Sequence, residues 1–84
     1  MFLYVFSDAL TGEIQQPFLA HSDDEAIRIA HMAFAPVSRQ ILRDLYVARV
    51  ICYDHDADPK FSLSPLYRGF DFISEVDSDA KENA

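Results

Sequence analysis

The feature that most constrains the fold is a helix start at Ser22-Asp23-Asp24-Glu25. Ser22 can accept a hydrogen bond from the backbone N–H of Glu25, and the Glu25 side chain can reach back to Ser22. Asp23 and Asp24 place negative charge at the positive end of the helix dipole. Pro36 ends the pattern, because the residue before a proline avoids the helical region. A helix is therefore predicted over residues 23–34, with an apolar stripe at helical spacing made of Ala26, Ile27, Ala30, Ala33 and Phe34.

The segment before this helix has the composition of two β-strands. Residues 2–6 are apolar at every position, so we expect a strand that is covered on both faces. Phe2, Tyr4 and Phe6 share one of those faces. A turn containing Gly12 follows, and a weaker strand is predicted over residues 13–20. Pro17 has no backbone N–H to donate, so this second strand should lie at a sheet edge or be broken there.

The segment after the helix predicts one more helix and further strands. Apolar residues four positions apart, Val37, Ile41 and Leu45, indicate a shorter helix over residues 37–45. A polar turn is expected at residues 54–60. Strands are predicted at residues 46–53, 61–64 and 69–73.

This order of elements favours an α+β fold. Most of the strands are joined by short turns, and short turns allow only antiparallel pairing. We therefore expect a small, mostly antiparallel sheet with one long and one short helix on one face. With 84 residues the chain has room for one domain, which we place at residues 1–74, followed by a flexible acidic tail at residues 75–84.

Charge and composition narrow the class of protein. Fourteen acidic residues against seven basic ones give a net charge of −7, which disfavours a general DNA coat because such binding needs Lys and Arg on phosphates. The apolar runs fall well short of the roughly 20 residues that span a bilayer, so no membrane partner is expected. Residues 1–6 also lack the basic flank of a signal peptide. A single cysteine, Cys52, lies in an apolar run and is interpreted as a core residue of a protein in a reducing compartment.

The acidic run Asp54-His55-Asp56-Ala57-Asp58 resembles the opening of a calcium-binding EF-hand loop. Such a loop needs glycine at its sixth position and glutamate at its twelfth. Counting from Asp54, these positions hold Pro59 and Pro65. We therefore interpret the run as a solvated hairpin turn.

No other pattern indicates catalysis or metal binding. His21, His31 and His55 do not pair with other ligands at metal-site spacing. Asp71, between two phenylalanines, is expected to point to water by strand alternation. No glycine-rich phosphate loop and no nucleophile–base pair is present in the sequence. We therefore expect a protein that is not an enzyme and that uses no metal and no cofactor.

Three arginines are the candidate contact residues for a nucleic acid or a partner. Arg39 and Arg43 are one helical turn apart, and Arg28 faces outward from the first helix. If both helices cover one side of the sheet, the three could share a surface that contacts phosphate. The alternative is that they are solvated and have local partners, such as Asp24 four residues before Arg28. An aromatic platform for single-stranded nucleic acid is a weaker interpretation in so acidic a chain.

Several short segments carry a family resemblance over residues 2–74, and the stretch 35–43 departs from it. They are, in order, Tyr4–Asp8, Thr11-Gly12, Pro17-Phe18, Asp24–Arg28, Asp44–Tyr46, Tyr53-Asp54 and Gly69–Ile73. Together they resemble the small non-structural protein of gokushovirus-type microviruses, the single-stranded DNA phages that include those of chlamydiae.

The resemblance implies a role like that of the microvirus C protein at a late switch in the host cytoplasm. Such a protein associates with the viral replication complex, halts duplex replication and commits single-stranded synthesis to packaging into the procapsid. The implied partners are that complex and the procapsid, with viral DNA as a further partner because family members are often called DNA-binding. The net acidity favours docking on a basic protein.

Two alternatives to this role stay open. One is direct binding of single-stranded DNA through Arg28, Arg39 and Arg43. The other is a host-directed inhibitor that binds a host enzyme. In any of these roles an exposed strand edge would allow copies of the chain to pair as a homo-oligomer.

Overall fold

The computed structural model describes the backbone at residues 1–15, 17–55 and 58–82, and the side chains at residues 1–15, 17–51 and 62–78. Its elements are β1 (Phe2–Asp8), β2 (Phe18–Ala20), α1 (Asp23–Phe34), α2 (Arg39–Leu42), β3 (Leu45–His55), β4 (Asp58–Arg68) and α3 (Gly69–Glu82). The described strands form one antiparallel sheet in the order β2-β1-β3-β4. The predicted α+β class with an antiparallel sheet is confirmed.

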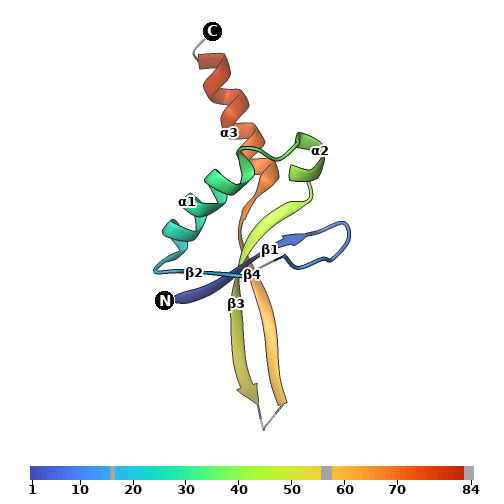
Figure 1. Ribbon diagram of the computed structural model, residues 1–84, viewed down its shortest axis with the longest axis vertical. Coiled ribbons are helices and arrows are strands. Elements are labelled where there is room, and N and C mark those ends of the chain that lie inside the picture. The colour runs from blue at the N-terminus through green and yellow to red at the C-terminus, as the bar shows by residue number, and fades with distance from the viewer. Residues whose placement is uncertain (16, 56–57, 83–84) are drawn as a thin grey trace.

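The helices gather at one end of the molecule, and the β3–β4 hairpin projects from the other (Figure 1). β1 pairs with β3 only between Leu45 and Arg49, so beyond Arg49 the two strands of the hairpin pair with each other alone. The molecule is consequently long and thin, with extents of 57 × 28 × 16 Å.

The capped helix forms where its sequence predicts it. Ser22 adopts an extended backbone, and its hydroxyl accepts a hydrogen bond from the Glu25 N–H at 3.2 Å. Of the predicted stripe, Ala26, Ala30 and Phe34 are buried against the sheet. Ala33, which we placed in the same stripe, is exposed instead.

Phe34 lies at the centre of the core. Its ring is 5.7 Å from that of Phe6 on the sheet, 6.2 Å from Tyr67 on β4 and 5.9 Å from Phe72 on α3. Tyr4 is also fully buried, and its hydroxyl donates to Asp23 at 2.8 Å, so its polar end is satisfied. Phe34 therefore joins the sheet, α1 and α3 in one packing unit.

The prediction of a last strand at residues 69–73 is wrong, because this segment opens α3. Phe70 and Phe72 do alternate, but Phe72 and Ile73 pack on the core while Phe70 is 53% exposed. Two neighbouring residues therefore both turn inward, which the alternation of a strand does not allow. The helix also continues through residues 75–82, where we expected a flexible tail.

Other boundaries shift as well. The second helix shrinks from residues 37–45 to the single turn of α2, and the strand expected over residues 13–20 reduces to β2 with one isolated bridge from Ile14 to Ser7. β2 does lie at the sheet edge, as Pro17 predicts. Much of the turn expected at residues 54–60 belongs to β3 and β4, since β3 runs to His55 and β4 begins at Asp58.

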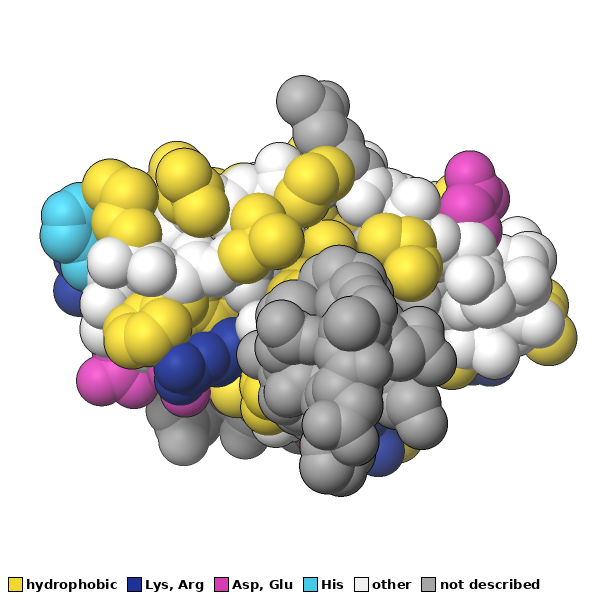
Figure 2. Space-filling view, turned by 90° about the horizontal axis from the view of Figure 1, so that it is seen from below, with side chains coloured by type: hydrophobic (Ala, Val, Ile, Leu, Met, Phe, Trp, Pro, Cys, Tyr) yellow, Lys and Arg dark blue, Asp and Glu magenta, His cyan; other side chains and the backbone are white. Residues whose placement is uncertain are grey.

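The second apolar face of the sheet is only partly covered. Val5 and Ala48, a registered pair of β1 and β3, are buried there, whereas Leu3 and its partner Leu19 are exposed. Seen from below, hydrophobic side chains are exposed at several separate places on this side of the molecule, among polar and charged ones (Figure 2). Cover on both faces, as predicted for residues 2–6, is thus confirmed for Val5 and wrong for Leu3 and for Phe2, which is also 40% exposed.

Candidate functional site

The structure places the three candidate arginines on two elements. Arg39 opens α2 and Arg43 ends it, while Arg28 lies in the N-terminal half of α1, and all three are exposed. The Arg39 guanidinium binds the Asp77 carboxylate of α3 through two hydrogen bonds, of 2.6 and 3.0 Å. Hydrogen bonding to Asp77 raises the pKa of Arg39. The Arg39–Asp77 ion pair therefore links α2 to α3.

Two further arginines are also paired with aspartates. Arg68 lies 3.1 Å from Asp71, whose pKa it lowers by hydrogen bonding. Arg49 lies 3.8 Å from Asp23 and stacks over the Phe2 ring at 3.8 Å. Three of the five arginines thus have carboxylate partners.

A polar cluster of His31, Tyr67 and Glu75 joins α1, β4 and α3. The Tyr67 hydroxyl donates to Glu75 at 2.6 Å, and His31 Nε2 lies 3.5 Å from the same carboxylate oxygen. The His31 ring stacks on Tyr67 with 5.0 Å between centroids. Because the Glu75 carboxylate accepts from Tyr67 and has the His31 ring beside it, the cluster links α1, β4 and α3.

The Tyr67–Glu75 hydrogen bond predicts a stability loss in alkali. Burial and the neighbouring carboxylate raise the pKa of Tyr67 above the value of about 10 that it has when unfolded. A raised folded pKa means that this contribution is present below about pH 10 and is lost as the pH rises further. Urea unfolding across that range should show the free energy of unfolding falling. The fall should be smaller in Tyr67→Phe, in which Tyr4 still titrates; an equal fall in both proteins would contradict the assignment.

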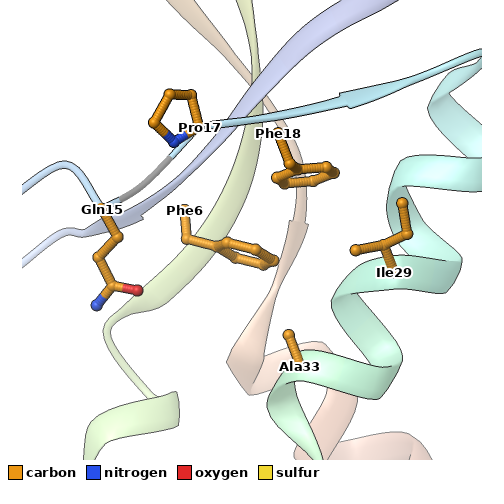
Figure 3. A pocket seen from close by; sticks show the side chains of 6 residues that line it. All are labelled: Phe6, Gln15, Pro17, Phe18, Ile29 and Ala33. Atoms are coloured by element: carbon orange, nitrogen blue, oxygen red, sulfur yellow. The ribbon is translucent and has the colours of Figure 1, made fainter.

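An open apolar groove of about 440 Å³ lies between α1 and the segment leading into β2. It is lined by Phe6, Gln15, Pro17, Phe18, Ile29 and Ala33, and we call these residues the α1 groove. Figure 3 shows Phe6 and Phe18 extending from the sheet toward α1, with Ile29 and Ala33 facing them from the helix. Gln15 and Pro17 close the opposite side, where the Gln15 N–H donates to the Phe6 carbonyl at 2.8 Å.

Sequence reasoning missed this groove. Ile29 and Met32 lie outside the predicted apolar stripe of α1, and Ala33 was placed within it. The sequence signal that could have indicated the groove is the number of apolar residues on α1, which is larger than one buried stripe contains. Ile29 is partly buried against the core, whereas Met32 is 71% exposed and Ala33 is exposed, so α1 carries apolar side chains that the sheet does not cover.

A cluster of metal ligands is absent from the described residues. Within residues 1–15, 17–51 and 62–78, no group of three His, Cys, Asp or Glu side chains could hold a metal ion. The side chains of Cys52 and of the run Asp54–Asp58 lie outside the described residues. No helix in the described part of the chain is long and apolar enough to cross a membrane.

Comparison of the chain with protein-family models, with curated proteins and with solved structures finds no match.

Proposed function

We propose that this chain is a protein-binding adaptor of a small single-stranded DNA phage. In this role it associates with the viral replication complex in the host cytoplasm at the late switch. It directs synthesis from duplex DNA to single strands that are packaged into the procapsid. The resemblance of residues 2–74 to the gokushovirus non-structural protein supports the phage context.

The pairing of arginines with aspartates is the observation that favours a protein partner over DNA. Arg39, Arg49 and Arg68 already have carboxylate neighbours, so their charge is largely offset before any ligand arrives. Arg28 and Arg43 make no ion pair with the described side chains, but Arg28 lies on α1 and Arg43 is the residue that caps the end of α2. With a net charge of −7, the chain is better suited to a basic protein surface than to a phosphate backbone.

Binding of labelled single-stranded DNA by the full chain should be weak and only slightly salt-dependent. Two available arginines would give a slope of log affinity against log salt near −1.4, at about −0.7 for each phosphate neutralised on a single strand. Fluorescence anisotropy over a salt series measures this slope. Tight binding with a much steeper slope, abolished by the double substitution Arg39→Glu and Arg43→Glu, would instead support direct DNA binding through the arginines.

Capture from phage-infected cells tests the partner. The viral replication protein or the procapsid should be the main component that co-purifies with a tagged copy of the chain. If one host enzyme is instead the main captured protein, the result would favour the host-directed inhibitor and contradict the replication role.

A further inference from the structure

The α1 groove has the size and chemistry of a docking site. Its volume of about 440 Å³ is roughly three times that of a ~150 Å³ cavity that holds benzene. The lining is apolar except for the side chain of Gln15. Apolar clefts of a few hundred Å³ with a few polar groups are typical of binding sites.

One wall of the groove is a helix that offers a ridge for packing. Ile29 and Ala33 stand at i and i+4, so they share one side of α1. The small side chain of Ala33 permits close approach of a second helix, whose apolar residues would enter between Phe18 and α1. This is the arrangement by which amphipathic helices bind in grooves.

The charges beside the groove are acidic. Glu25 lies one helical turn before Ile29 on the same side of α1, and Glu13 lies two residues before Gln15 on the segment that forms the opposite wall. Both side chains are accessible, and the Glu25 carboxylate lies 3.6 Å from His21. Arg28 points about 100° away from Ile29 around the helix axis. A segment with positive charge at its ends would therefore complement this groove better than an acidic one.

We infer that the α1 groove binds an amphipathic helical segment of a partner protein whose apolar face is flanked by Lys or Arg. This inference deepens the proposed function and rests on it for the partner's identity. The shape of the groove and the charges beside it determine what kind of segment binds.

A designed peptide tests the inference on the full chain. The probe is a fluorescent, helix-forming peptide with leucine at i, i+3, i+4 and i+7 and lysine at both ends, compared with a matched peptide that has glutamate at the ends. By anisotropy, the lysine peptide should bind at least tenfold more tightly than the glutamate peptide. Equal binding of the two peptides would overturn the charge requirement.

Two variants locate the binding. Ala33→Arg places a long charged side chain in the groove at an exposed helical position, where arginine is well tolerated. Ala35→Arg makes the same change at the exposed end of α1, outside the groove. Ala33→Arg should weaken peptide binding at least tenfold, whereas Ala35→Arg should leave it unchanged. An unaffected Ala33→Arg variant would overturn the inference.

Methyl NMR of the unmodified chain gives a result that no folding defect can imitate. Peptide addition should shift the methyl signals of Ile29 and Ala33 and leave that of exposed Ile41 on α2 in place. Self-association that Ala33→Arg abolishes, without peptide binding, would assign the groove to a second copy of the chain and overturn the partner helix.

The two proposals fail separately. If the replication protein is captured equally well by Ala33→Arg, the groove is not the docking site although the adaptor role stands. If the lysine peptide binds in the groove but neither replication protein nor procapsid is captured, the adaptor role fails and the groove stands.

Discussion

Replacing Phe34 with alanine is expected to lower the free energy of unfolding by about 3–5 kcal/mol, the usual cost of emptying a large aromatic site in a core. The Phe34 side chain is fully buried and contacts the rings of Phe6, Tyr67 and Phe72. A domain of this size has a total stability of only about 5–15 kcal/mol, so the variant should unfold at much lower urea. The loss should also loosen α3, since Phe72 on that helix loses its partner.

Met32→Ala is the matched control for Phe34→Ala. Met32 belongs to the same helix but is 71% exposed, so its truncation should change the free energy of unfolding by no more than about 0.5 kcal/mol. Equal urea midpoints for the two variants would show that Phe34 does not hold the core together.

Replacing Gly69 with alanine should destabilise the protein by about 1–3 kcal/mol, as overpacking does. A Cβ atom at Gly69 would overlap the carbonyl oxygen of Leu42, so the backbone of α2 or of α3 must move. Helix propensity alone predicts the opposite sign, a gain of up to about 1 kcal/mol for alanine over glycine. A fall in the free energy of unfolding would show that the close approach of Gly69 to Leu42 dominates, whereas a rise would show that helix propensity dominates.

Urea unfolding and backbone NMR measure the outcome of Gly69→Ala. Shifts should spread to α2 and to the Arg39–Asp77 ion pair, because these contacts require α3 to start where it does. Ser78→Ala, at an exposed position on the same helix, should be nearly neutral. A stabilised Gly69→Ala protein would mean that the junction of β4 and α3 is not tightly packed.

Local chemistry explains which elements the sequence predicts well. The cap at Ser22 and the stop at Pro36 act within a few residues, so the bounds of α1 could be predicted to the residue. The local pattern of residues 69–73 does not distinguish a strand from a helix. Phe70 and Phe72 fit a period of two, while Phe72, Ile73 and Val76 fit a helix, and a window this short does not decide between them.

Contacts between distant segments explain what the sequence leaves hidden. Arg39 was a candidate for phosphate, but its partner Asp77 lies 38 residues further along the chain. The α1 groove likewise combines residues from β1, from the segment before β2 and from α1. Which apolar side of α1 the sheet would cover depends on how the helix docks, and sequence periodicity does not carry that information.

The projecting hairpin and the long α3 affect how the size of this protein must be measured. Its radius of gyration is 14.5 Å, whereas a compact chain of 84 residues would have about 12 Å. A value of 14.5 Å is what a compact chain of about 140 residues would show. On a gel-filtration column a single copy would therefore elute between the positions of a globular monomer and dimer. Light scattering, which reports mass independently of shape, is the measurement that can decide whether copies of this chain pair.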